Sequence, residues 1–155
     1  MKATNIILPA VIIAAMSLSA CSGDPNDKAR DLLNEARKEY DNGDYEKTLS
    51  LIDSLRKTCP KAIKEREKAL KIFQNASEKL TQKQIAATDS ALQQVKIQII
   101  CHQNFMDRRA MLGIVPTKEE LSQLTYLKLL RDSLQARFDT QCATVRFIRA
   151  KRKGN

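Results

Sequence analysis

Apolar residues recur every three or four positions along most of the chain, which is the period of an α-helix and not of a β-strand. The first such segment is predicted to begin at Pro25, because Asp24 can cap a helix and proline is favoured at its first position. Its apolar side carries Ala29, Leu32, Leu33, Ala36 and Tyr40. The run Asp41-Asn42-Gly43 predicts its end, because Asn and Gly tolerate the left-handed backbone of a C-cap.

A second helix is expected to follow at once, with Asp44 as its N-cap. Its apolar face consists of Tyr45, Leu49, Ile52 and Leu55. Pro60 predicts both the end of this helix and the start of a third. From residue 61 to residue 112 the chain contains neither Gly nor Pro, so the third helix is expected to be long.

The long third segment shows two apolar patterns in succession. Its first part begins an apolar stripe with Ile63, Leu70, Phe73, Ala76 and Leu80. Its second part has a seven-residue repeat, with Val95 as an additional apolar position: Ile85, Leu92, Ile99 and Met106. A seven-residue repeat is typical of a coiled-coil seam. Residues 75–78 or 88–90 could interrupt the helix, because both contain residues that can cap a new one.

Gly113 is expected to end the long helix, and Thr117 with Glu120 forms a capping box that starts the last one. The apolar stripe of this last helix is Leu124, Leu127, Leu134, Phe138, Val145 and Ile148, interrupted by Arg131 and Gln141. Because the connection is short, the two helices should be antiparallel neighbours. The predicted fold is all-α, with a short helical hairpin at 27–60, a long antiparallel, coiled-coil-like hairpin at 61–150 and a basic tail at 151–155.

Composition agrees with this fold class. The chain has 155 residues, of which 5% are aromatic, and it contains four Gly, four Pro and no Trp. This length allows one ordinary domain and excludes a multidomain enzyme. So few turn-forming and aromatic residues argue against a β-sandwich or barrel and favour long helices.

The pattern of the N-terminal residues predicts an export signal. Lys2 supplies a short positive region, residues 6–15 are almost wholly apolar, and Leu18-Ser19-Ala20-Cys21 follows. The apolar stretch is shorter than the roughly 20 residues that a membrane-spanning helix needs. A cleaved signal peptide at 1–20 is therefore expected rather than a permanent transmembrane helix.

The sequence Leu-Ser-Ala-Cys resembles the lipobox of bacterial envelope lipoproteins, which implies lipidation of Cys21 and a mature chain that starts there. Residues 21–26 would then link the lipid anchor to the first helix. Cleavage after Ser19 by an ordinary signal peptidase is the alternative. Ser22 resembles the pattern of lipoproteins sorted to the outer membrane rather than the inner one, whereas the acidic residues that follow resemble a surface-export tag. The periplasmic or exposed side therefore stays open.

The first two helices also resemble one tetratricopeptide repeat. The matching positions are Ala36, Gly43, Tyr45, Thr48, Ile52, Leu55 and Pro60. Thr48 stands where alanine is usual, and Glu39 where an apolar residue is usual. No second Gly-x-Tyr-x-x-Ala element follows, so this single helical hairpin is expected to pack against the remaining helices. The resemblance implies a surface that binds other proteins.

The net charge of +9 ordinarily suggests a nucleic-acid partner, but the export signal argues against one. Five cations gather near the C-terminus: Arg146, Arg149, Lys151, Arg152 and Lys153. Two interpretations fit them. They can bind anionic lipid or lipopolysaccharide phosphate, or they can complement the negative end of the last helix dipole.

Residues with chemical reactivity are few and scattered. His102 is the sole histidine and is interpreted as lying at the edge of the apolar seam, with no acid on its own face. Cys59, Cys101 and Cys142 are expected to be buried free thiols, with an intermolecular disulfide as the alternative. Their spacing along the predicted hairpin argues against an internal bond between Cys101 and Cys142. No catalytic, cofactor-binding or metal-binding motif is found.

The sequence therefore predicts a non-enzymatic, lipid-anchored helical adaptor or scaffold in a bacterial envelope, with an envelope protein as its unknown partner. The alternative is a binder of anionic envelope lipid, lipopolysaccharide or cell-wall polymer that acts through the C-terminal cations. Neither function requires a cofactor or a metal. Homo-oligomerisation stays open, because the apolar seam can be covered within one chain or between two.

Overall fold

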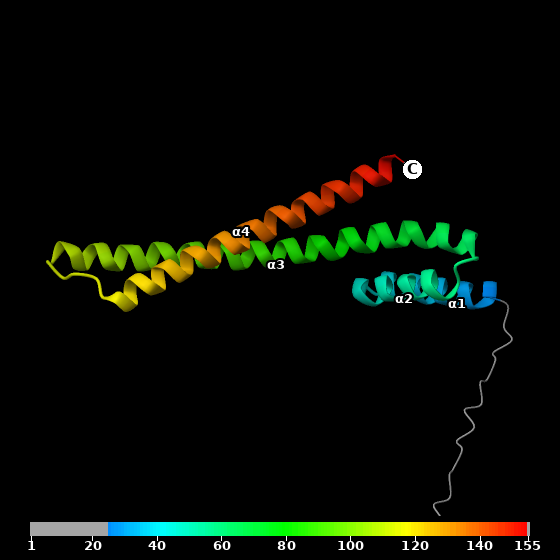
Figure 1. The fold of residues 1–155 in the computed structure, drawn as a ribbon, viewed down its shortest axis with the longest axis horizontal. Coiled ribbons are helices and arrows are strands. Elements are labelled where there is room, and N and C mark those ends of the chain that lie inside the picture. Colours follow the sequence, from blue (N-terminus) through cyan, green and yellow to red (C-terminus); the bar gives the residue numbers. More distant parts are fainter. Residues whose placement is uncertain (1–24, 155) are drawn as a thin grey trace, which may run out of the picture.

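The computed structural model describes residues 25–154, and within them the chain forms four α-helices and no strand (Figure 1). These are α1 (Pro25–Asp41), α2 (Tyr45–Thr58), α3 (Ile63–Met111) and α4 (Lys118–Lys153). The prediction of an all-α fold is confirmed. The signal peptide, Cys21 and the first part of the linker lie outside the described residues.

The first two helices pack against each other and against the beginning of α3. Their shared core consists of Leu33 and Ala36 from α1, Ile52 and Leu55 from α2, and Ala69 from α3. Gly43 has a φ of +78° in the turn between α1 and α2, a conformation that favours glycine. Asp44 then caps α2, because its side chain accepts a hydrogen bond from the Lys47 amide at 3.0 Å. The predicted roles of Gly43 at the end of the first helix and of Asp44 as the next N-cap are confirmed.

Helix α3 is continuous over 49 residues, or about 74 Å at 1.5 Å per residue. Neither of the two interruptions considered from the sequence occurs. The second half of α3 packs against α4 through Val95, Ile99 and Leu127. Val95 and Ile99 belong to the predicted seam, and Leu127 belongs to the apolar stripe predicted for the last helix. Along this stretch the two predicted apolar stripes therefore contact each other within one chain.

The turn between α3 and α4 forms the end of the long hairpin farthest from α1 and α2 (Figure 1). Gly113 has a φ of +74° there, and the capping box of Thr117 and Glu120 is present with both of its hydrogen bonds. Several large apolar side chains of this tip are exposed: Met111, Leu112, Ile114 and Val115. The tip is therefore apolar as well as distant from the short hairpin.

The predicted apolar stripe is right only in part for the first turns of α3. Ala76 is buried and Phe73 packs against the core as predicted. Ile63 is 65% exposed and Leu70 is 38% exposed, however, and Ala69, which the stripe did not include, is buried. The cause is that α3 meets the α1–α2 hairpin here with a different side from the one that it turns to α4. Alanine on that side permits close helix approach, and Leu70 is left outside the contact.

Three other expectations need correction. Helix α2 ends at Thr58, two residues before Pro60, and α3 begins at Ile63 after Ala62, whose side chain makes no capping hydrogen bond. The basic segment 151–155 is not a separate tail, because α4 continues to Lys153.

The cysteines agree with the prediction only in part. Cys59, Cys101 and Cys142 are all free, but only Cys59 is buried. Cys101 is exposed and Cys142 is half-buried, so the expectation of buried thiols is wrong for Cys101. Cys101 lies at the edge of the α3–α4 contact, where it lines a shallow surface pocket with Gln123 and Leu127 of α4.

Candidate functional site

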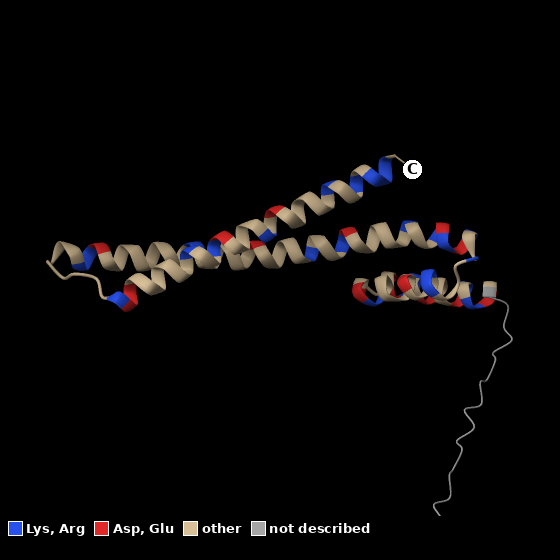
Figure 2. Cartoon of the chain, viewed as in Figure 1, with Lys and Arg blue, Asp and Glu red and all other residues tan. Residues whose placement is uncertain are grey.

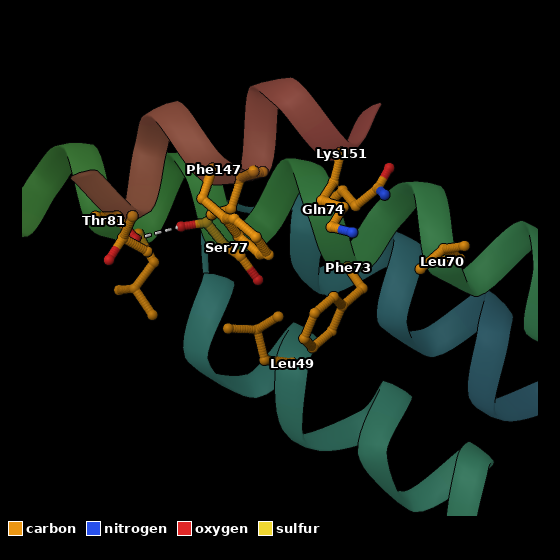
Figure 3. A pocket seen from close by; sticks show the side chains of 11 residues that line it. Leu49, Leu70, Phe73, Gln74, Ser77, Thr81, Phe147 and Lys151 are labelled. Atoms are coloured by element: carbon orange, nitrogen blue, oxygen red, sulfur yellow. Dashed lines mark hydrogen bonds between the residues drawn. The ribbon is translucent and has the colours of Figure 1, made fainter. Parts of the chain in front are cut away.

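An apolar groove of about 650 Å³ runs between α2, α3 and α4. It exists because α2 and α4 both pack against the first half of α3 but not against each other. Six apolar side chains line it: Leu49, Leu70, Phe73, Leu80, Phe147 and Ile148. Figure 3 shows Leu49 of α2 beside Phe73 of α3, with Phe147 of α4 on the other side of the opening. The volume lies within the range of ligand and partner sites in proteins.

The two threonine hydroxyls that line the groove already form hydrogen bonds. The Thr81 hydroxyl donates to the carbonyl oxygen of Ser77 at 2.8 Å, the bond drawn in Figure 3. The Thr144 hydroxyl donates in the same way to the carbonyl oxygen of Thr140 at 2.9 Å. Both hydroxyls are thus satisfied within their own helices, and an apolar occupant can cover them without leaving them unpaired.

Cations border the aromatic side chains of the groove. The Lys151 Nζ lies 5.6 Å from the centre of the Phe147 ring, and the Arg56 guanidinium carbon lies 4.2 Å from that of Phe73. Lys151 is the one charged residue among the described residues that line the groove. Cation–π contacts at exposed sites are worth about 0.5–1 kcal/mol and hold such cations near the ring faces. The border of the groove is therefore positive.

One wall of the groove is held in place by a buried carboxylate, Glu78 of α3, which is 8% exposed. Its Oε1 accepts a hydrogen bond from Arg149 Nε at 2.7 Å, and its Oε2 accepts one from Arg152 Nη2 at 2.6 Å. Arg152 also donates to Asn75 Oδ1 at 2.7 Å. We call these four residues the Glu78 clasp. It fixes the last turns of α4 to α3 beside the groove.

The clasp also changes the acidity of its carboxylate. The hydrogen bond from Arg149, together with the positive charge of Arg152, lowers the pKa of Glu78 below its ordinary value of 4.5, although burial acts in the opposite direction. The ionised carboxylate is thereby favoured in the folded protein.

The five predicted basic residues have different roles in the structure. Figure 2 shows their Lys and Arg positions gathered in the last turns of α4. Arg149 and Arg152 are engaged by Glu78, and Lys151 borders the groove. Arg146 and Lys153 are exposed and form no ion pair with any described residue. The five cations thus form three groups in the structure: two that bind Glu78, one that borders the groove and two without an ion pair to a described residue.

The sequence considered His102 for catalysis, and the structure places it against the backbone of α4. His102 is half-buried, and its Nε2 lies 2.9 Å from the carbonyl oxygen of Glu120, which the ring N–H can reach as a donor. Within residues 25–154, no group of three His, Cys, Asp or Glu side chains could hold a metal ion. No described helix is long and apolar enough to span a bilayer.

Comparison with known proteins gave no relative: no family model, no curated protein and no solved structure matches this chain.

Sequence reasoning missed both the groove and the clasp. Phe147 and Ile148 were visible as apolar neighbours of the basic cluster, and Glu78 as an acid within a largely uncharged stretch of the long segment. Whether these residues of α3 and α4 come together depends on the register of α4 on α3, and the groove depends also on the position of α2. A signal was present in the hairpin register, because residues near 78 and near 150 lie at equal distances from the predicted turn.

We expect Glu78→Gln to lower the free energy of unfolding by about 1–2 kcal/mol at pH 7, because it weakens two charge-assisted hydrogen bonds to half-exposed arginines. Urea unfolding followed by circular dichroism measures this change. Glu67→Gln is the matched control, since Glu67 is an exposed acid on the same helix and no ion pair is found for it. The pKa of Glu78 is lower in the folded protein than its ordinary value of 4.5. The stabilisation from ionised Glu78 is therefore fully present above pH 4.5, and it is lost as the pH falls through the lower folded-state pKa. Equal stability of the two variants at pH 7 would contradict the assignment.

Proposed function

We propose that the protein is a lipid-anchored bacterial envelope protein that acts as a non-enzymatic helical adaptor for protein–protein interaction. The observation that carries the adaptor role is the apolar groove between α2, α3 and α4. A partner that fills this groove covers Leu70 and Phe147, which are exposed in the isolated chain. The lipobox-like sequence before Cys21 supports the anchor.

The geometry favours a helix as the occupant. With α3 as the floor and α2 and α4 as the walls, the groove lies where a fourth helix packs in a four-helix bundle. An amphipathic helix satisfies its own backbone hydrogen bonds and needs only apolar contacts from the groove. Because Lys151 and Arg56 border the opening, acidic residues at the edges of that helix would complement it.

The anchor is tested by Cys21→Ser, which removes the thiol that the diacylglycerol would modify. We expect the natural chain to remain with membranes and to show an acylated N-terminus at Cys21 by mass spectrometry, since two or more acyl chains give stable anchoring. The Cys21→Ser chain should lack the acyl mass and keep residues 1–20, because diacylation of the thiol precedes cleavage at a lipobox. Cys101→Ser, which alters an exposed thiol elsewhere, should behave as the natural chain does. An unmodified Met1, or a mature chain that begins at Ala20, would overturn the anchor.

The adaptor role is tested by Leu70→Asp in the groove, with Ile97→Asp as the control. Both side chains are exposed and both lie on α3, but Ile97 lies outside the groove. A charge in the groove should weaken partner binding at least about tenfold, because it is desolvated without a counter-ion. The measurement is stoichiometric recovery of an envelope protein by the tagged chain from detergent-solubilised membranes. Recovery that Leu70→Asp leaves unchanged, or that the natural chain never shows, would reject the groove as the partner site.

A second function is favoured by the cations that remain unpaired. Arg146, Lys151 and Lys153 are exposed and form no ion pair with the described residues, so they are available to anionic lipid, lipopolysaccharide or cell-wall polymer. Arg149 and Arg152 contribute less in this function than the sequence predicted, because Glu78 already neutralises part of their charge. Each available cation near an anionic surface is worth about 1 kcal/mol.

Neutralising these three residues together as Arg146→Gln, Lys151→Gln and Lys153→Gln should weaken binding to anionic vesicles by about a hundredfold. Vesicle co-sedimentation in a Cys21→Ser background measures it without a contribution from the anchor. The matched control neutralises three exposed lysines before and within the start of α3: Lys61, Lys64 and Lys68. If both triple variants bind alike, the C-terminal cations are not a specific anionic site.

A further inference from the structure

The segment that joins α3 to α4 is uncharged over seven consecutive residues, from Met111 to Thr117. Turns ordinarily consist of Gly, Pro, Asn, Asp and Ser, but four of these seven positions carry large apolar side chains. All four are exposed: Met111 by 85%, Leu112 by 77%, Ile114 by 43% and Val115 by 79%. We call these four side chains the apolar tip. In a chain with 29% charged residues, such a turn indicates a contact that the single chain does not make.

We propose that the apolar tip inserts into the surface of a lipid bilayer. The size of the tip favours a bilayer over a protein partner. Two helices, each about 10 Å wide, end side by side here, so the end of the hairpin presents about 200 Å². A stable protein–protein interface buries about 800 Å² on each partner. A bilayer surface needs no matching shape, and it takes up apolar side chains at the boundary between headgroups and acyl chains.

The backbone of the turn has few amide groups that need water. The amides of residues 112–114 donate to carbonyl oxygens in the last turn of α3 at 2.9–3.0 Å. Pro116 has no N–H, and the Thr117 amide donates to Glu120 Oε2 at 2.8 Å. Five of the six residues from 112 to 117 therefore either bond their amide within the chain or have none. Because an unpaired amide is costly at membrane depth, this backbone suits insertion.

The charges next to the apolar tip are balanced. Three acids and three bases lie within four positions of the uncharged segment: Asp107, Arg108, Arg109, Lys118, Glu119 and Glu120. Among them Arg109 and Glu120 form an ion pair with each other. Insertion of the tip should therefore not require anionic lipid, in contrast to binding through the C-terminal cations.

The apolar tip and the beginning of the described chain lie at opposite ends of the molecule. Figure 1 shows the α3–α4 turn at one end of α3 and the start of α1 beside the other end. A bilayer that receives the tip therefore faces the end of the hairpin farthest from α1. With Cys21 anchored as proposed above, on which this step rests, that bilayer is a second one. The protein then contacts two bilayers, one through its acyl chains and one through its tip.

A tryptophan in the tip reports insertion directly, because the natural chain contains none. The acylated Leu112→Trp chain is reconstituted into phosphatidylcholine vesicles, and a second population that contains brominated phosphatidylcholine is then added. Bromine quenches tryptophan on contact, so the added vesicles should quench the fluorescence. Ile97→Trp is the matched control and should keep its fluorescence. Ile97 is 60% exposed on the same helix, about 22 Å along α3 from Leu112.

Val115→Asp in the Leu112→Trp chain places a charge in the apolar tip. It should weaken association with the second vesicles at least about tenfold, because an ionised carboxylate has to be desolvated on insertion. Titration with the brominated vesicles measures this change. Ile97→Asp in the same Leu112→Trp chain puts the same charge on α3 outside the tip and should leave the association unchanged. Both altered side chains are exposed, and circular dichroism confirms that each variant keeps its helices.

Three results would overturn the proposal: no quenching by the added vesicles, equal association of the two aspartate variants, or quenching only by brominated lipid in the vesicles that hold the anchor. Association that requires anionic lipid and is lost at high salt would also overturn it, in favour of the C-terminal cations. Flotation of the first vesicles tests the anchor separately. A chain that leaves them rejects the proposed anchor, whereas a chain that stays with them unquenched rejects the tip contact alone. Leu112 and Val115 lie outside the groove, so loss of groove binding is separable as well.

Discussion

The structure depends on a single long helix that has to bury apolar side chains against different neighbours along its length. Helix α3 continues through 49 residues without a break, and the α1–α2 hairpin covers only its beginning. Helix α4 covers the remainder and extends back over the first half from another side. Because both neighbours are fixed to α3 rather than to each other, the short hairpin and the α3–α4 pair have separate cores, and a groove lies between α2 and α4.

This arrangement explains the polar contacts around the end of α4. Beyond Val145, α4 has few buried apolar residues with which to hold its position. The Glu78 clasp supplies directional contacts instead, and it does so with two arginines from successive turns of α4. Arg149 and Arg152, which the sequence assigned to a cluster of exposed cations, therefore hold α4 in place as one wall of the groove. Only the other cations of the cluster remain free to bind an external anion.

The features that sequence reasoning predicted are local ones. Asp44, Gly113 and the Thr117–Glu120 capping box act through residues within four positions of themselves, so their roles follow from sequence alone. The seam was predictable because a seven-residue repeat implies a neighbouring helix. Exposure of Leu70 was not predictable, since it depends on which side of α3 the short hairpin covers.

The length of α3 also determines how far the molecule extends from its point of attachment. Ala29 of α1 packs with Cys59 and Ala62 just before α3, so the start of the described chain lies near the start of that helix. If the anchor is at Cys21, at most about 14 Å of backbone joins it to Pro25. The apolar tip around Leu112 lies a further helix length away, about 74 Å. Held upright, such a molecule is a spacer whose standoff distance from the bilayer is set by the residue count of one helix.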